Sequence, residues 1–297
     1  MKTFQIKLQN IVNILTPFQA DTIFGHLCWV VAHDKGDKEL KNFLEPFVRG
    51  GPPFIISDGF PGDFLPKPLT VELFTDKQKR EDRKKWKKID LLEICDFESV
   101  RRGEICVPKD IPDGTVSIYS KVYNTINRLN NTTLAEGGVY SLKEMSISSV
   151  SIYIKTESED CKNQVVNLFE KLSKAGYGRK KSIGKGHFLV SEVKNFEVPK
   201  IENANGFVTL SNFCPAKNDP TDGLYKTFVK YGKLGEEYTF CGNPFKKPIL
   251  MIKAGSVFKT NGEPKEFYGR MISEGISPAK PEVVHYAYAF AVPIIFP

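Results

Sequence analysis

The segment at residues 176–187 holds the densest set of residues that could do chemistry. It contains four glycines, four Lys or Arg and no acidic residue. Glycine allows positive φ and a close approach to a ligand, and successive amides in such a turn can bind an anion. A merely flexible hairpin loop would not need the cations. We expect polyphosphate or nucleic acid to bind here, through Gly176, Gly178, Arg179, Lys180, Lys181, Ser182, Gly184, Lys185 and Gly186.

This segment differs from the common phosphate-binding motifs. A Walker A motif has one residue fewer between its glycines than the five that separate Gly178 from Gly184. Gly186 also stands where that motif has the Ser or Thr that binds Mg²⁺. The third glycine of a dinucleotide-binding G-x-G-x-x-G is missing as well. Nucleotide hydrolysis and dinucleotide binding therefore lose their main candidate.

A second candidate segment, residues 119–133, interleaves cations and polar side chains with tyrosines. Such a mixture can stack on bases and hold a sugar-phosphate backbone. A polar irregular loop is an equally good interpretation of this stretch alone. Its candidate RNA-binding residues are Lys121, Tyr123, Asn124, Arg128 and Thr132. The charged run at residues 76–88, with eight Lys or Arg and three acids, is more typical of a solvent-facing helix.

The four histidines are isolated in sequence. His26 lies in an apolar stretch typical of a core helix, whereas His187 borders the glycine-rich segment and could act as a base in RNA cleavage. Zinc binding by His26, Cys28 and His33 is disfavoured, because His26 and Cys28 would point about 200° apart on a helix. No nucleophile elbow, H-E-x-x-H motif or carboxylate cluster occurs. We expect neither a metal nor another cofactor.

The composition indicates a globular intracellular protein. The 297 residues, 41% of them hydrophobic, can bury a sizeable core in one large domain or two. A formal net charge of +7 favours phosphate-bearing partners. The six cysteines show no C-x-x-C spacing, which favours a reducing cytoplasm. No apolar stretch approaches the ~20 residues that span a bilayer, so we expect no membrane contact.

Periodic patterns outline the elements that must position these segments. Before residue 199 they predict strands at 4–8, 54–58, 148–155 and 187–193. They also predict helices at 20–32, 39–48 and 159–174. Asp21 or Thr22 is placed to cap the first helix, and the middle region up to residue 147 is expected to be irregular. After Pro199, strands are expected at 207–210, 249–252 and 285–292.

The order of these elements is a split β-α-β pattern with a long insertion, as in ferredoxin-like or RRM-like domains. We therefore expect an α+β protein with two ferredoxin-like domains. The first would span residues 1–198, with an insertion at about 54–147 and the glycine-rich loop at 176–186. The second would span residues 199–297.

Several motifs, taken in order along the chain, resemble one known family. They are Pro17-Phe-Gln-Ala-Asp-Thr-Ile-Phe-Gly-His-Leu-Cys-Trp, Pro53-Phe-Ile-Ile-Ser-Asp-Gly-Phe-Pro, Leu65-Pro-Lys-Pro, Tyr123-Asn-Thr-Ile-Asn-Arg, Ser182-Ile-Gly-Lys-Gly-His-Phe, Lys253-Ala-Gly-Ser-Val-Phe and Tyr286-Ala-Tyr-Ala-Phe-Ala-Val-Pro. No single motif is decisive. Their ordered set resembles the RAMP subunit of type III-A (Csm) CRISPR effector complexes that caps the crRNA 5′ handle.

The resemblance implies two ferredoxin-like domains, the first with an inserted thumb-like β element, and a non-catalytic role. Such a subunit binds the repeat-derived 5′ handle of crRNA and joins the large polymerase-like CRISPR subunit to the backbone RAMP subunit. It meets target RNA only indirectly. The glycine-rich loop and the region of Asn124 and Arg128 match the family's RNA-contacting segments, and Asp21 and Thr22 join the candidate RNA-binding residues. His187 stands where relatives often have Arg.

Two other functions stay open. A RAMP endoribonuclease that processes precursor crRNA would use His26 or His187 as its base and leave 2′,3′-cyclic phosphate ends. A generic RNA-binding module outside CRISPR would not copurify with a polymerase-like subunit and a discrete small RNA.

Overall fold

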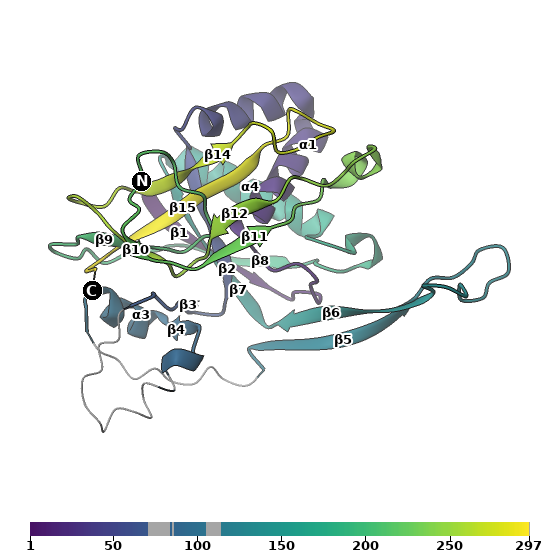
Figure 1. Cartoon of the computed structure of the whole chain (residues 1–297), viewed down its shortest axis with the longest axis horizontal. Helices are drawn as coiled ribbons and strands as arrows, with labels where there is room; N and C mark the ends of the chain where they lie inside the picture. Colours follow the sequence, from purple (N-terminus) through teal and green to yellow (C-terminus); the bar gives the residue numbers. More distant parts are fainter. Residues whose placement is uncertain (71–83, 85, 105–113, 297) are drawn as a thin grey trace.

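The first half of the chain builds a four-stranded antiparallel sheet. The computed structural model describes residues 1–70, 84, 86–104 and 114–296. The strands lie in the order β2-β7-β1-β8 and are β1 (Lys2–Gln9), β2 (Phe54–Pro61), β7 (Ser149–Thr156) and β8 (Leu189–Asn195) (Figure 1). In β1, the apolar residues Phe4, Ile6 and Leu8 are buried. These strands confirm the four that the sequence predicts before residue 199.

Two helices pack beside this sheet. Helix α1 (Ala20–Val48) follows β1, and α4 (Glu159–Ala175) follows β7. Gly36, with a φ of 82°, interrupts α1, so its two segments correspond to the two helices expected there. Ser158 caps α4 by accepting a hydrogen bond from the Cys161 amide at 3.1 Å. No helix in the described part of the chain is both long and apolar enough to cross a membrane.

The start of α1 differs from the expectation that Asp21 or Thr22 caps it. The residue before the helix is Gln19, and its side chain makes no capping hydrogen bond. Instead, the carboxylate of Asp58, at the middle of β2, accepts the Ala20 amide at 2.8 Å. A residue distant in sequence therefore satisfies this helix end, which a local pattern cannot reveal.

The insertion between β2 and β7 ends in a long two-stranded arm. The short strands β3 (Phe64–Pro66) and β4 (Leu91–Glu93) pair, and α3 (Ile94–Arg101) follows. Strands β5 (Val116–Asn124) and β6 (Val139–Ile147) then pair antiparallel and project from the body of the molecule (Figure 1). We call these strands and their connection the β5–β6 arm. The expectation of an irregular middle region is wrong here.

The helix expected at residues 76–88 lies largely outside the described residues. Lys84 and residues 86–88 are helical. That interpretation of the charged run therefore stays a prediction.

The second half is a strand-rich unit. Its five-stranded sheet has the order β10-β13-β9-β15-β14 and consists of β9 (Gly206–Thr209), β10 (Gly223–Leu224), β13 (Val257–Lys259), β14 (Phe267–Ile272) and β15 (His285–Ile294). Strands β11 (Thr227–Lys230) and β12 (Ile249–Ile252) form a separate pair. Residues 199–296 contain the 3₁₀ helix η3 (Glu236–Phe240) but no α-helix. A second ferredoxin-like domain, which needs two helices, is therefore not confirmed.

The two halves share one hydrophobic core. The ring of Phe24 in α1 stacks on Tyr286 of β15 with centroids 4.7 Å apart. The Tyr288 hydroxyl donates to the Phe47 carbonyl at 2.5 Å. Buried residues from both sides of residue 199 form a single cluster. The mixed α+β class is thus confirmed, and the boundary at 198/199 stays a prediction.

Candidate nucleic-acid interface

The glycine-rich loop joins α4 to β8 through repeated left-handed backbone turns. Gly176, Gly178, Gly184 and Gly186 all have positive φ, and so does Lys180 at 64°. The short 3₁₀ helix η2 (Lys181–Ile183) lies at its centre. The Gly186 amide donates to the Val12 carbonyl at 3.1 Å, and the Val12 amide to the His187 carbonyl at 2.8 Å. The loop is therefore fixed to the chain that leaves β1.

Two of the glycines are required by the protein's own packing. A Cβ on Gly186 would lie 1.9 Å from the Tyr177 carbonyl oxygen, and one on Gly178 would lie 2.8 Å from the Thr16 Cβ. Gly184 faces open space, so its requirement for glycine comes from a φ of 84° alone. The Gly186 position is thus explained without a nearby RNA.

Most backbone amides of the loop already have partners within the protein. The acceptors are protein carbonyls for most of them, the His26 ring nitrogen for Gly178 and the Thr16 hydroxyl for Arg179. The amides used in this way are those of Gly176, Tyr177, Gly178, Arg179, Ile183, Gly184, Lys185 and Gly186. The expected anion site of successive free amides is therefore wrong for these positions, and affinity for phosphate would have to come from side chains.

The four cations of the loop are not equally available. Lys181 is paired with Glu236 of η3, and Lys185 Nζ lies 2.7 Å from the Glu144 carboxylate. Lys180 donates to the Tyr140 hydroxyl at 3.0 Å. Arg179 is exposed and makes no ion pair with any residue that the structure describes. Arg179 is thus the most accessible cation, and Ser182 is exposed beside it.

The base of the β5–β6 arm meets this loop around Glu144. The Glu144 side chain is fully buried and accepts hydrogen bonds from Lys185, Tyr123 and Tyr119, the last at 3.3 Å. Burial alone would raise the pKa of Glu144, but the hydrogen bonds from Lys185 and Tyr123 outweigh it and hold the pKa below its ordinary value. The hydrogen bond between Lys185 and Glu144 also raises the pKa of Lys185. This carboxylate therefore joins the two segments that the sequence singled out.

Aromatic rings and lysines lie together at this junction. Lys180 Nζ lies 5.4 Å from the Tyr140 ring centroid and 6.0 Å from that of Tyr123. Lys121 Nζ lies 5.9 Å from the Tyr123 centroid. The two rings stack at 5.8 Å. The structure thus places Lys121 and Tyr123 near the glycine loop. Both residues lie on strand β5, so the alternative of a polar irregular loop at this position is wrong.

The remaining candidates of the arm lie away from the loop. Asn124 ends β5 and is 3.5 Å from the Thr133 hydroxyl. Thr132 donates to Asn130, and Arg128 is exposed in the connection between the strands. Their hydrogen bonds are local to the end of the arm. Any contact they make with RNA would be separate from the loop.

Asp21 and Thr22 face the second half of the chain. Lys230 Nζ on β11 lies 2.9 Å from the Asp21 carboxylate and 3.2 Å from the Thr22 hydroxyl. The Asp21 side chain is only 3% exposed. His285 approaches the same carboxylate at 3.6 Å. Lys230 thus covers Asp21 and Thr22. The sequence could not indicate this contact, because more than 200 residues separate Lys230 from Asp21.

His26 supports the glycine loop. Its Nε2 accepts the Gly178 amide at 3.0 Å, and its ring lies 4.9 Å from that of Tyr177. Burial is the main cause that lowers the pKa of His26 to about 4. The imidazole is therefore neutral near pH 7, with its acceptor nitrogen occupied. Burial also raises the pKa of Cys28 to about 12, so this thiol is protonated near pH 7.

A hollow lies beside the loop, between α1, the end of α4 and η3. It has a volume of about 250 Å³ and is lined by residues that include Trp29, His33 and Lys171. Lys171 is paired with Asp34 at 2.6 Å. The lysines of this hollow are thus already paired, and we assign no ligand to it.

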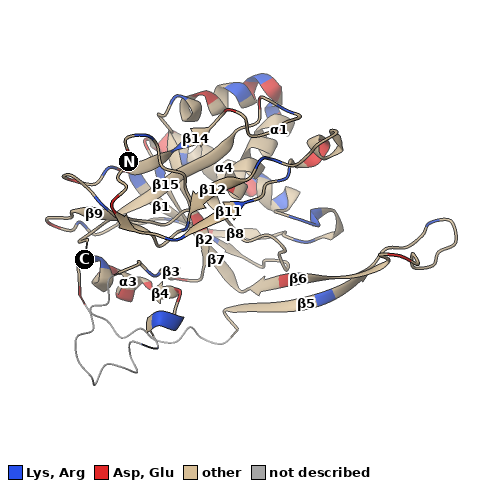
Figure 2. Cartoon of the chain, in the orientation of Figure 1, with Lys and Arg blue, Asp and Glu red and all other residues tan. Residues whose placement is uncertain are grey.

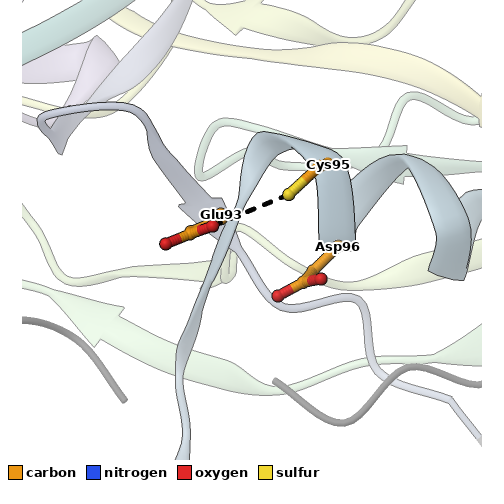
Figure 3. Close-up of side chains that lie close together, drawn as sticks. All are labelled: Glu93, Cys95 and Asp96. Carbon is orange, nitrogen blue, oxygen red and sulfur yellow. Dashed lines mark hydrogen bonds between the residues drawn. The ribbon is translucent and has the colours of Figure 1, made fainter. Parts of the chain in front are cut away.

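One group of possible metal ligands occurs in the described part of the chain. Glu93, Cys95 and Asp96, where β4 passes into α3, have ligand atoms within 4.8 Å of one another (Figure 3). The Cys95 thiol lies 3.6 Å from the Glu93 carboxylate. Carboxylates near a surface often gather without a metal, so we assign no site to them.

The basic residues of the chain are spread over several elements, among them α1, β5 and the loop after α4 (Figure 2). Together with the geometry above, they define a basic and aromatic surface where the glycine loop meets the β5–β6 arm. Proteins that bind single-stranded nucleic acid combine cationic and aromatic side chains in this way.

Comparison with solved structures finds full-length matches. A chain of the Csm1-Csm4 cassette in complex with pppApA matches with a TM-score of 0.67 and 21% identity, over 100% of this chain and 99% of that one. A chain of the Csm3-Csm4 subcomplex of the type III-A CRISPR-Cas interference complex matches with a TM-score of 0.63 and 15% identity, over 99% of each chain. Csm4 is the component common to the two. No family model and no curated protein matches the sequence.

At these identities the comparison establishes the fold. The chain has the α+β fold found in these CRISPR effector structures, along its whole length. The fold agrees with the family that the ordered sequence motifs resemble.

Proposed function

We propose that this chain is the Csm4-type subunit of a type III-A CRISPR effector complex and binds the 5′ repeat-derived handle of crRNA. The observation that carries this proposal is the contact between the glycine loop and the base of the β5–β6 arm. There Lys180, Tyr140 and Tyr123 lie within about the range of a cation–π contact, and Arg179 is exposed nearby in sequence. The full-length likeness in fold supports the same conclusion.

The arrangement suits single-stranded RNA. Lysine and arginine neutralise phosphates, and tyrosine faces can carry unpaired bases. The closed backbone of the loop would hold Arg179 and Ser182 at a fixed position, while the β5–β6 arm would act as the thumb-like element beside the strand. In this proposal the sheet β2-β7-β1-β8 with α1 and α4 is a ferredoxin-like domain, since its interleaved β-α-β units have that order.

We also propose that the chain joins the large polymerase-like subunit to the backbone RAMP subunit in the cytoplasm. Two of the matching structures support this, because one pairs Csm4 with Csm1 and the other pairs Csm4 with Csm3. Coexpression of the three subunits with a crRNA gene tests it. The complex should lose either its large subunit or its 5′ end protection when this chain is omitted.

A photocrosslinking experiment tests the RNA contact itself. crRNA carrying 4-thiouridine in the handle should crosslink to this chain, whereas the same nucleotide near the 3′ end should crosslink to other subunits. Peptides from the glycine loop and from β5 or β6 should carry the adduct. Crosslinks confined to the 3′ position would contradict the proposal.

In this proposal the chain has no active site of its own. His26 supports that view, because its Nε2 is occupied by the Gly178 amide and a base needs a free nitrogen. The alternative, a RAMP endoribonuclease, would then depend on half-buried His187. Replacing His187 by Ala should leave crRNA maturation unchanged, and so should replacing His26 by Gln, which keeps an acceptor for the Gly178 amide. Loss of mature crRNA from a folded, abundant His187→Ala variant would favour the nuclease.

A further inference from the structure

Strands β11 and β12 present an exposed face that the function above does not use. Along β11 and its continuation, Tyr225, Val229 and Tyr231 are 50%, 44% and 76% exposed. On the other strand and its approach, Leu250 and Phe245 are 65% and 61% exposed. We call these five side chains the β11–β12 strip. Val229 and Leu250 have inward-packing sequence neighbours, of which Met251 is buried and Phe228 partly buried.

The pairing of the strands places Val229 and Leu250 on one face. Val229 is directly opposite Leu250, and Lys233 forms a bridge with Phe245 further along. Residues two apart on a strand point to the same side. Lys230, on the other side, reaches Asp21, so the inner face of this strand pair is anchored to α1. Apart from Tyr225, whose ring stacks on Phe258 with centroids 5.5 Å apart, the strip is exposed on an anchored strand pair.

The strand pair carries positive charge without carboxylates. Residues 223–235 and 245–253 contain no Asp or Glu. Their exposed cations are Lys226, Lys233, Lys247 and Lys253. Lys233 Nζ lies 5.7 Å from the Phe245 ring centroid. Alternation of exposed aromatic rings with unpaired cations is the composition of a single-strand stacking surface.

The strip is connected to the glycine loop. The segment that leaves β11 runs into η3, where Glu236 pairs with Lys181 of the loop. The strands themselves lie side by side along the body of the molecule (Figure 1). The segment that follows β11 thus reaches the glycine loop, and the strip lies on the same strand pair.

We propose that the β11–β12 strip is a second surface for single-stranded RNA, on which unpaired bases stack at Tyr231 and Phe245 while the lysines contact phosphates. This inference rests on the proposed function, and it extends the surface along which the protein would contact RNA. The lack of carboxylates favours a polyanion over a protein with mixed charges. A protein partner on the same face is the rival outcome.

The test measures how affinity grows with RNA length. Fluorescein-labelled oligouridines of 6 and 24 nucleotides are titrated with the full chain by anisotropy. The Tyr231→Ala/Phe245→Ala variant should bind the 24-mer about tenfold or more weakly, because each stacked base contributes roughly 1–3 kcal/mol. It should bind the 6-mer like the original chain. The matched control Tyr231→Phe/Phe245→Tyr keeps both rings and should bind both RNAs normally.

The outcomes separate this proposal from the one it rests on. If neither RNA binds the original chain, the proposed function itself fails. If the Ala variant binds both RNAs normally, the strip is not an RNA surface and this inference is overturned. Loss of a partner subunit from the coexpressed complex, with RNA binding unchanged, would assign the strip to a protein. Equal thermal unfolding of both variants checks folding, which these exposed side chains should not disturb.

Discussion

The glycine loop and the β5–β6 arm meet at one surface, but the protein holds them in different ways. In the loop, most amides donate to protein acceptors, and a side chain at Gly186 would strike the Tyr177 carbonyl. In the arm, nearly every residue of β5 is exposed. The hydrogen bonds of the connection at residues 125–134 stay within that end of the arm. The loop is fixed by the fold, and the arm is fixed only at its base.

Contacts at its base anchor the arm, and besides the bonds from Lys185 to Glu144 and from Lys180 to Tyr140 they come from the chain after β1. Ile14 and Met145 exchange backbone hydrogen bonds of 2.9 and 2.8 Å, and Asn13 donates to Glu144 at 3.1 Å. An isolated two-stranded hairpin is marginally stable in water, so these anchors decide where the arm points. In the proposed function, the loop would offer RNA a preformed surface at little entropic cost, whereas the arm would adapt to the RNA that it meets.

The largest effect should come from Gly186→Val. The new Cβ would lie 1.9 Å from the Tyr177 carbonyl oxygen, at a φ of 72° that valine disfavours. We expect a loss of roughly 2–5 kcal/mol in unfolding free energy, or a displaced loop, and loss of RNA binding in either case. Urea unfolding and anisotropy with handle RNA measure both.

The matched change in the arm is Gly137→Val. Gly137 also has a positive φ, of 64°, but no atom lies within 4 Å of its Cβ position. The Gly137→Val substitution should cost only about 1–2 kcal/mol of local backbone strain and leave the glycine loop intact.

Normal RNA binding by the Gly186→Val variant would show that the fixed geometry of the loop is irrelevant to RNA binding.

Whether a helix or strand of this fold could be predicted from the sequence depends on whether one of its faces is buried. Strand β1 was predictable because Phe4, Ile6 and Leu8 face a core while their neighbours are more polar, and α4 because Val165, Phe169 and Leu172 share one face. Strand β5 was not predicted. Both of its faces are largely exposed, so apolar Val116 and Ile118 mix with serines and no buried face enforces a contrast.

The candidate site was predictable from the sequence only in part, because local composition does not reveal long-range pairs. The composition of residues 176–187 marked the loop, and the structure shows what composition cannot: which cations are already paired. Lys185 pairs with Glu144, which is 41 residues away in sequence, and Lys181 pairs with Glu236, which is 55 residues away. Such pairs leave no periodic signal. Alternation in Tyr119, Lys121 and Tyr123 could have indicated one face of a strand, had an exposed strand been considered.

The second prediction concerns the charge of the loop. Replacing Arg179, Lys180 and Lys181 together by Ala should weaken RNA binding and reduce the log–log salt slope by up to about 2, at ~0.7 for each lost contact with single-stranded RNA. Because Lys180 and Lys181 have protein partners, Arg179→Ala alone should account for most of the change. The exposed triple Lys35→Ala/Lys38→Ala/Lys41→Ala on α1 is the matched control. An equal slope change in the control would mean that only net charge matters.

The third prediction concerns the support of the loop by His26. Its pKa is about 4 in the folded chain, below the ordinary value of 6.5, because it is buried. The unfolded chain therefore takes up the proton first, and the stability contributed by neutral His26 is complete above pH 6.5 and lost as pH falls towards 4. Between pH 7 and pH 5 this contribution should fall by about 2 kcal/mol.

The variant His26→Gln isolates that contribution, since a glutamine oxygen can accept the Gly178 amide without titrating. Its unfolding free energy should fall less between pH 7 and pH 5 than that of the original chain. Asp58 acts in the opposite direction, because burial raises its pKa to about 7, and His285 acts in the same direction as His26. Both remain in the variant and cancel in the comparison. Identical pH dependence of the two proteins would contradict the role given to His26.

The smallest effect should come from Arg128→Ala at the far end of the arm. Arg128 is exposed and makes no ion pair with any described residue, so its removal should change unfolding free energy by less than about 0.5 kcal/mol. If it touches one phosphate, the salt slope should fall by at most about 0.7 and the affinity for handle RNA should change only modestly. An adaptable arm can shift to form another contact, whereas the fixed loop cannot replace Arg179. Should Arg128→Ala weaken binding more than Arg179→Ala, the arm would be the principal RNA contact, and the division of work between the two regions would have to be reversed.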